Sequence, residues 1–459
     1  MSTISTLKTH GISLGSTYPS PLTITSTGAV EASSGNAIYG STSQAWTVVN
    51  SGLVEATGYL GDGVYLKGAA SLVTNSGTIA ATQGRGILLA DGGTVMNTGM
   101  INGSPGVGVY MSLGGYVGNS AGGLIEGGIG VRILGAAGTV TNSATILGKI
   151  TSIGGPTGVV GLYKGGSVAN TGTGLIEGYT GVYIAGAAGT ITNSGTIVAA
   201  GIGGFGIGVN LGAGGSVGNT GLIEGYDGVA ISGSAGTVTN SGTIESASAR
   251  GVFLGAGGSI DNKAGLIEGN HSGVDVYLGT GTVSNFGTIV ATGPSGVGVE
   301  LGGGGTVIDA GTIIGHTEIG FGGTGNDLLV LEPGYAALSG VYGGEGGGTN
   351  TLELGSAAGV GTVSGLGSKF LFFGTVTVDA GARWVLSDSN TIGNGGTLVD
   401  AGTISGGGLV VESGGIEFVL SGGAASGTVL SGGTEIVSAG GRASGTIVAS
   451  GGREYVHGT

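Results

Sequence analysis

The chain has 459 residues, of which 115 are glycine, and it carries a formal net charge of −14 with only 12 basic residues. Binding to phosphate backbones or to anionic lipid needs clustered Lys and Arg, so this composition argues against nucleic acid and against an anionic membrane surface as partners. Cysteine is absent and no run reaches about 18 apolar residues, so the sequence predicts neither disulfides nor a membrane-spanning segment.

Residues 1–44 open the chain and fit the repeat that follows them poorly. They contain no apolar stretch of signal-peptide length, and Lys8 is the first basic residue. Because the end of a stacked array is an open sheet edge that invites aggregation, we expect this segment to be an N-terminal cap.

Residues 45–320 contain three short patterns that recur in phase. One is Gly-Val-x-Leu or a close variant, as at 63–66 and 181–184, and another is a short segment such as 123–126. The third is an apolar residue, any residue, then Asn, at intervals of 21 to 26 residues with one of 28. This pattern ends at Asn50, Asn75, Asn97, Asn119, Asn142, Asn170, Asn193, Asn219, Asn240, Asn262 and Asn285, and Asp309 takes the next place.

Each repeat therefore holds three short segments in which apolar residues alternate with polar ones, which is the pattern of a strand. Strands this short are unstable alone, but stacked about 4.8 Å apart each one pairs with its equivalents in neighbouring coils. The sequence predicts an all-β fold, a parallel β-helix or β-solenoid with three short strands per coil of about 22 residues. Crossover rules favour a right-handed coil.

The recurring Asn is expected to be structural. Asn tolerates bends, its amide satisfies backbone groups at corners, and amides stacked on successive coils form a hydrogen-bonded ladder. A Leu-Ile-Glu-Gly motif ending at Gly127, Gly178, Gly225 and Gly269 marks a longer, double-coil unit. We interpret its glutamates as a solvated outer row, with a cation-binding row as the alternative.

The middle residue of Gly-Val-x-Leu should point outward because its neighbours point into the core. We predict that aromatic residues at this position share one face and bind a ligand by stacking on sugar rings or on a protein partner. The predicted ligand-binding residues are Tyr65, Tyr110, Tyr183, Phe253 and Tyr277, with gaps at Arg132, Asn210 and Ala230. The alternative is that these aromatic rings only shield the neighbouring strands.

Residues 321–410 are predicted to continue the solenoid irregularly. Residues 322–330, Gly-Gly-Thr-Gly-Asn-Asp-Leu-Leu-Val, match one calcium-binding nonapeptide in which Asp327 and turn carbonyls would supply hard oxygen ligands. Such sites need consecutive nonapeptides, and only a partial echo follows, at 343–346 with Asn350. We predict no cofactor, with calcium as the alternative to a simple Gly-Asn-Asp turn.

From residue 411 to 459 the repeat shortens, and Gly pairs recur at steps of 8 to 11 residues. The stretch 432–448 resembles the 19-residue repeat of AIDA-type adhesins, the passenger parts of bacterial autotransporters. The resemblance implies a surface-exposed bacterial β-helix, secreted or associated with the outer membrane, that is often adhesive and is exported by a C-terminal barrel. No barrel-like series of long strands precedes Thr459, so we expect either a fragment or another export route.

Catalysis finds little support in the sequence. Asp275 and Glu300 fall on neighbouring coils, on the face formed by the Gly-Val-x-Leu segments, but no basic partner is evident from spacing. We predict a non-enzymatic adhesin or scaffold that contacts a host or environmental surface, glycans included. The alternative is a polysaccharide-active β-helix enzyme, a lyase or glycosidase. An ice-binding solenoid ranks last because Thr-x-Thr segments such as 139–141 occur only on alternate coils.

Overall fold

The computed structural model describes residues 1–149, 158–200, 205–344 and 349–457. These residues form strands and turns with no helix, arranged as a parallel β-solenoid of about 20 coils of about 22 residues each. The predicted fold class is therefore confirmed. Unit 1 comprises Met1–Val238 and Gly242–Ala249, and unit 2 comprises Thr239–Ser241 and Arg250–Thr459.

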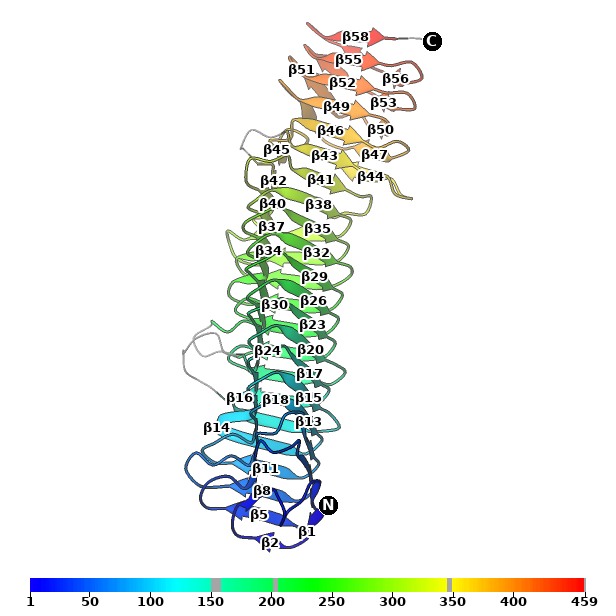
Figure 1. Ribbon diagram of the computed structural model, residues 1–459. Coiled ribbons are helices and arrows are strands. Elements are labelled where there is room, and N and C mark those ends of the chain that lie inside the picture. The colour runs from blue at the N-terminus through cyan, green and yellow to red at the C-terminus, as the bar shows by residue number, and fades with distance from the viewer. Residues whose placement is uncertain (150–157, 201–204, 345–348, 458–459) are drawn as a thin grey trace. The chain divides into compact units, whose positions relative to one another are not determined.

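In unit 1 each coil gives one strand to sheet A1 and two to sheet B1, and these strands stack as parallel rungs (Figure 1). Sheet A1 contains β1 (Ser2–Ile4), β4 (Leu22–Ile24), β7 (Thr47–Asn50), β10 (Ser71–Asn75), β13 (Gly93–Asn97), β15 (Gly115–Asn119), β17 (Gly138–Asn142), β20 (Gly166–Asn170), β23 (Gly189–Asn193) and β26 (Gly215–Asn219). A further strand, β29 (Gly236–Asn240), has residues in both units.

Sheet B1 has two rows of strands. The first row contains β2 (Leu7–Lys8), β5 (Ala29–Ala32), β8 (Leu53–Ala56), β11 (Thr78–Ala81), β18 (Thr145–Gly148), β21 (Leu175–Gly178), β24 (Thr196–Ala199), β27 (Leu222–Gly225) and β30 (Thr243–Ser246). The second contains β3 (Ile12–Ser13), β6 (Ile38–Gly40), β9 (Val64–Leu66), β12 (Ile87–Leu89), β19 (Val160–Leu162), β22 (Val182–Ile184), β25 (Val209–Leu211) and β28 (Val229–Ile231). The long strands β14 (Met100–Met111) and β16 (Leu124–Ile133) contribute to both rows.

Residues 1–44, which we expected to cap the solenoid, themselves form coils with the same three strands. β1 pairs with β4, β2 with β5 and β3 with β6, all in parallel. These coils lack the Asn pattern, so the repeat could not be recognised in this part of the sequence.

The core of unit 1 consists of the apolar residues that alternate along each strand, such as Val73, Val95 and Ile101, which are fully buried. The coils stack closely where the strands of sheet A1 begin. Gly93 has φ of +145°, and a Cβ there would lie 2.3 Å from the Ser71 carbonyl oxygen of the preceding coil. Glycine is required at such a contact because any side chain would push the two coils apart.

The predicted Asn ladder is confirmed within each unit. In unit 1 the side-chain amide of each Asn donates to the side-chain oxygen of the Asn one coil later, at 2.8–2.9 Å, from Asn50 through to Asn219. In unit 2 the same bonds join Asn240 to Asn262, Asn262 to Asn285, and Asn285 to Asp309, at 2.8–3.0 Å. These side chains are buried, so the ladder is part of the interior.

Unit 2 begins with the same design. Sheet A2 contains β32 (Gly258–Asn262), β35 (Gly281–Asn285), β38 (Gly305–Asp309), β41 (Leu328–Leu331), β43 (Thr351–Leu354), β46 (Thr375–Val378), β49 (Thr397–Asp400), β52 (Ile416–Val419), β55 (Thr434–Val437) and β58 (Arg453–Val456). Sheet B2 contains β31 (Arg250–Leu254), β33 (Leu266–Gly269), β34 (Ser272–Val276), β36 (Thr288–Ala291), β37 (Val297–Leu301), β39 (Thr312–Ile314), β40 (Thr317–Phe321), β42 (Val341–Tyr342) and β45 (Phe370–Leu371).

Two other sheets replace sheet B2 in the later coils of unit 2. Sheet C2 contains β44 (Gly361–Val363), β47 (Arg383–Leu386), β50 (Thr403–Ser405), β53 (Ala424–Ser426) and β56 (Arg442–Ser444). Sheet D2 contains β48 (Asn390–Ile392), β51 (Leu409–Glu412), β54 (Val429–Ser431) and β57 (Ile447–Val448). In sheet A2, Thr397 pairs with Ile416, Ile416 with Thr434, and Thr434 with Arg453, steps of 19, 18 and 19 residues.

Candidate functional site

The outer face of sheet B1 carries a column of residues contributed by the second strand of each coil. Tyr39 pairs in register with Tyr65, Tyr110 pairs with Arg132, and Tyr183 pairs with Asn210. The structure thus places three of the predicted residues, Tyr65, Tyr110 and Tyr183, in one column of unit 1. All three are half-buried.

Cationic side chains lie over these rings. Lys67 Nζ is 5.6 Å from the Tyr39 ring centre and 5.3 Å from that of Tyr65. The two tyrosines pack edge-to-face with ring centres 5.6 Å apart. Tyr65 and then Tyr39 raise the pKa of Lys67, and the ammonium lies within cation–π distance of both rings.

Further along the column, the Arg85 guanidinium carbon lies 5.3 Å from the Tyr110 ring centre, and Arg85 Nε donates to Asp62 Oδ1 at 3.0 Å. Arg132, which the sequence suggested was a gap, lies 5.1 Å over the ring of Tyr163. Tyr163 packs edge-to-face against Tyr183 at 5.6 Å. We call Tyr39, Tyr65, Tyr110, Tyr163 and Tyr183, together with Lys67, Arg85 and Arg132, the tyrosine face.

Arg132 and Tyr163 interact through a cation–π contact rather than through hydrogen bonds. Within the described residues, Arg132 Nε and the Tyr163 hydroxyl are buried and have no hydrogen-bond partner. Burial raises the pKa of Tyr163, although the charge of Arg132 opposes the rise. The contact between the two side chains is therefore the Arg132 cation over the Tyr163 ring.

The prediction for Tyr277 is wrong as to position. In unit 2, Phe253 pairs in register with Asp275, and Asp275 pairs with Glu300, so the column residue of that coil is Asp275. Tyr277 lies just after β34, is 60% exposed, and has its ring centre 6.5 Å from that of Phe253. Phe253 is in the predicted position, with the Arg250 guanidinium 3.9 Å from its ring centre.

The structure places a basic side chain, Arg250, beside the carboxyl group of Asp275, a partner that the sequence spacing did not indicate. An Arg250 guanidinium nitrogen lies 3.3 Å from Asp275 Oδ2. Burial, and then the charge of Asp275, raises the pKa of Glu300, while His271 and Arg250 oppose the rise. The arrangement is two carboxyl groups on neighbouring coils, one of them paired with a guanidinium and the other with a raised pKa.

Asp327 of the calcium-type motif is buried and already engaged. Its Oδ1 accepts the Gly305 amide at 2.9 Å, and its Oδ2 accepts the Gly344 amide at 3.2 Å. Both oxygens of Asp327 therefore already accept backbone amides, as a structural turn requires, and calcium binding at this motif stays a prediction. Residues 345 and 346 of the second motif lie outside the described residues. The described residues contain no group of three or more His, Asp or Glu side chains placed to hold a metal.

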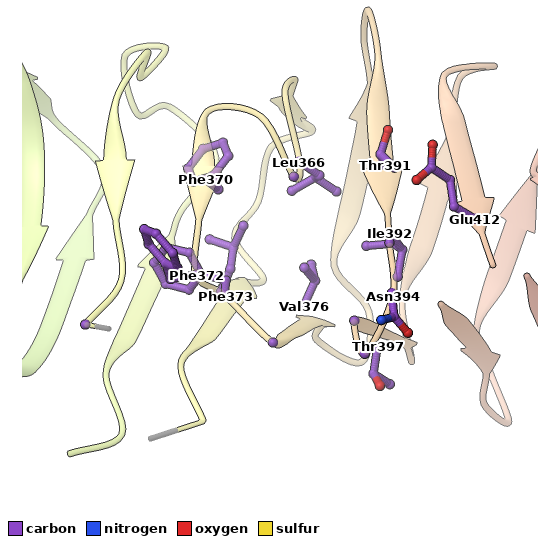
Figure 2. Close-up of a pocket in the computed structure, with 17 residues that line it drawn as sticks. Leu366, Phe370, Phe372, Phe373, Val376, Thr391, Ile392, Asn394, Thr397 and Glu412 are labelled. Carbon is purple, nitrogen blue, oxygen red and sulfur yellow. The ribbon is translucent and has the colours of Figure 1, made fainter. Parts of the chain in front are cut away.

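A cavity of about 540 Å³ lies in unit 2 where sheet B2 ends and sheet D2 begins. Figure 2 shows Phe370, Phe372 and Phe373 on one side of it and Thr391, Asn394 and Glu412 on the other. The opening follows from the strand pairing: β45 pairs with β42, β48 pairs with β51, and no ladder joins β45 to β48 among the described residues.

Comparison of the chain with known protein families, with curated proteins and with solved structures gave no match. The part of the chain that the structure describes also contains no helix long and apolar enough to cross a bilayer.

Sequence reasoning missed Tyr39, Tyr163 and Lys67. Tyr39 lies in the segment expected to be a cap, yet Ile38-Tyr39-Gly40 has the alternation of the other column strands and was a usable signal. Tyr163 lies two residues beyond the column position, which Gly161 occupies. An aromatic ring that reaches across a neighbouring glycine is visible only once the coils are stacked.

Proposed function

We propose that this chain is an extracellular or cell-surface structural adhesin, similar to an autotransporter passenger, which binds a host or environmental surface through the tyrosine face without catalysis. The tyrosine face is the observation that carries the proposal. Five aromatic rings and three cations follow one face of unit 1, and each ring is fixed by an edge contact or a cation. Rigid, amphipathic rings give binding area at a low entropy cost.

Glycans are the ligand class that this face suits best. Sugar rings present C–H faces that stack on phenol rings, and their hydroxyl groups accept from Lys67 and Arg85 and donate to the tyrosine hydroxyls. The repeat spacing suits a linear polymer, because column positions recur at about the 4.8 Å rung distance and tyrosines occupy several of them, Tyr39 and Tyr65 on successive coils. Secretion and association with the outer membrane are part of the proposal and rest on the resemblance of residues 411–459 to AIDA-type repeats.

The test compares two triple variants of the full-length chain. One removes Tyr65, Tyr110 and Tyr183 from the face by substitution with Ser. The control removes three tyrosines of unit 1 that lie off the face, Tyr59, Tyr116 and Tyr226, in the same way. Binding to surfaces coated with cellulose, chitin or mucin is measured by biolayer interferometry, and circular dichroism checks the fold.

We expect the wild type and the control to bind at least one surface, and the face variant to bind it about tenfold more weakly. Equal binding by the face variant and the wild type, with both folded, would contradict the proposal. A loss of the same size in the control would contradict it too, because binding would then not depend on this face.

A polysaccharide-active enzyme is a second candidate, which the contact between Arg250 and Asp275 beside Glu300 favours. Paired carboxyl groups with different environments are the usual acid and base of glycan cleavage. The test is release of new reducing ends or unsaturated uronates from a polysaccharide panel. Cleavage that is lost in both Asp275→Asn and Glu300→Gln would establish the enzyme, and no cleavage by the wild type would reject it.

A further inference from the structure

The cavity at the end of sheet B2 has one wall of aromatic rings, one of which is held in an unusual conformation. Phe372 has φ of +66°, in the left-handed region that bulky residues avoid, and its side chain is 52% exposed. Phe373 is fixed by packing edge-to-face on Phe321 at 6.3 Å. Strain of this kind persists where the surrounding structure imposes it, and here it accompanies a ring that lines the cavity instead of joining the core.

The opposite wall is polar and its backbone is bare. Thr391, Asn394 and Glu412 supply a hydroxyl, an amide and a carboxylate, and Gly393, Gly395 and Gly396 line the cavity beside them. A Cβ at Gly393 would meet only Glu412 Oε2, at 3.9 Å, so the cavity extends to the backbone there. Glycines of this kind allow a ligand to approach the chain closely.

Charge limits what this cavity accepts. Glu412 is the one charged side chain among the lining residues, which include no Lys, Arg or His. An anionic ligand would therefore meet only repulsion, whereas a neutral or cationic ligand with several hydroxyl groups would find acceptors in Glu412, Asn394 and Thr391.

We propose that this cavity is a binding site for a neutral or amino pyranose, a single sugar or the end of a glycan chain. The apolar face of the sugar stacks on the exposed ring of Phe372, and its hydroxyl or ammonium groups bond to Glu412 and Asn394 on the opposite wall. The volume of about 540 Å³ lies within the range of small-ligand sites. The site lies in unit 2 and shares no residue with the tyrosine face, so it does not depend on the adhesive role proposed above.

The test is a titration of the full-length chain, followed by saturation-transfer NMR, with glucose, galactose, mannose, N-acetylglucosamine, glucosamine and glucuronate. We expect at least one neutral or amino sugar to bind with a millimolar Kd, and glucuronate to bind about tenfold more weakly or not at all. Phe372→Ala should weaken the binding about tenfold. Phe286→Ala is the matched control, because Phe286 is 53% exposed in the same unit and does not line the cavity.

Gly393→Leu is a second variant, which fills the cavity from a position whose backbone conformation suits any residue. It should abolish binding while circular dichroism stays unchanged. Glu412→Gln should weaken glucosamine binding more than glucose binding, because only the former is charged. The proposal is overturned if none of the panel binds. It is also overturned if binding survives both Phe372→Ala and Gly393→Leu, or if glucuronate binds as well as glucose.

Discussion

The Asn ladder of unit 1 and the glutamates near the C-terminal end of unit 2 are both rows of polar side chains inside the solenoid, but their hydrogen bonding is opposite. Asn97 donates to Asn119 and accepts from Asn75, each at 2.8 Å. Glu417 and Glu435, which pair in register and are fully buried, are poorly satisfied. Within the described residues, neither oxygen of Glu417 makes a hydrogen bond of normal geometry, and Oε1 of Glu435 also lacks a partner.

The difference lies in the chemistry of the side chains. An amide has both a donor and an acceptor, so identical amides stacked one coil apart satisfy each other. A carboxylate has only acceptors, so a second carboxylate one coil away offers it no donor, and the two negative charges repel each other. A proton on one of them supplies the missing donor and removes the repulsion. Burial, reinforced by Glu435, raises the pKa of Glu417 to about 8, which Thr428 opposes only in part. The Asn ladder of unit 1 is therefore insensitive to pH, whereas the row formed by Glu417 and Glu435 is not.

The largest expected effect is the pH dependence of the C-terminal coils. A carboxyl group with a raised folded-state pKa contributes stability that is fully present below its unfolded value of about 4.5 and is lost as the pH rises to about 8. The free energy of unfolding should fall by an amount on the order of 4 kcal/mol if the shift belongs to Glu417 alone. Asp400, whose pKa burial raises to about 6, acts in the same direction. Urea unfolding of the full chain, followed by Trp384 fluorescence in unit 2, measures the change.

A break in the Asn ladder should have the second-largest effect on stability. Asn97→Leu removes the acceptor of Asn75 and the donor to Asn119, as well as bonds to the Gly99 and Leu124 carbonyls. Because buried polar groups are left unpaired on both neighbouring coils, we expect a loss of about 3 kcal/mol in unit 1. Met96→Leu, at the exposed neighbouring position, is the control and should change stability little. An unchanged melting curve for Asn97→Leu would mean that the ladder contributes nothing to the fold.

Removal of the unsatisfied Glu417 carboxyl group should increase the free energy of unfolding, whereas the break in the Asn ladder should decrease it. Glu417→Leu places an apolar side chain in a column that Leu398 and Val376 occupy in the two preceding coils. We expect it to stabilise the C-terminal coils by about 2 kcal/mol near pH 8 and to flatten their pH dependence. Destabilisation at that pH would show that Glu417 has a partner that the hydrogen-bond geometry does not reveal.

The smallest expected effect concerns the tyrosine face. Arg132→Gln removes the cation over Tyr163 and should cost about 1 kcal/mol. The melting temperature of the full chain, compared with Lys164→Gln as an exposed control, tests this. A loss of several kcal/mol would mean that the face belongs to the fold more than to a binding surface.

The strands and the Asn ladder could be predicted from the sequence because they repeat every coil, and each repeat is an independent observation of the same position. Asp275 could also have been placed, since Gly273-Val274-Asp275-Val276 has the column pattern and Tyr277 follows it. The inward direction of the Glu417 side chain could not be predicted from the sequence. Ile416 and Phe418 flank it and are more apolar, so alternation alone puts Glu417 outside, but the pairing of Ile416 with Thr397 fixes the opposite direction.

The two candidate sites differ in the same way. Three residues of the tyrosine face came from a repeated position, whereas the contacts of Tyr163 with Arg132 and Tyr183 depend on offsets between coils. The cavity beside Phe372 depends on the place where β45 stops pairing, and that event occurs once among the described residues. A feature without repetition leaves no period for the sequence to reveal.

The most direct test of the central claim, that the interior polar columns set the pH response of each region, is amide hydrogen exchange read by mass spectrometry on the full-length chain. Peptides within 47–119 report on the Asn ladder, and peptides within 397–456 report on the glutamate row. Between about pH 5 and about pH 9, after correction for the intrinsic exchange rate, we predict unchanged protection in the first set and a marked loss in the second. Equal loss in both sets, or none in the second, would contradict the account.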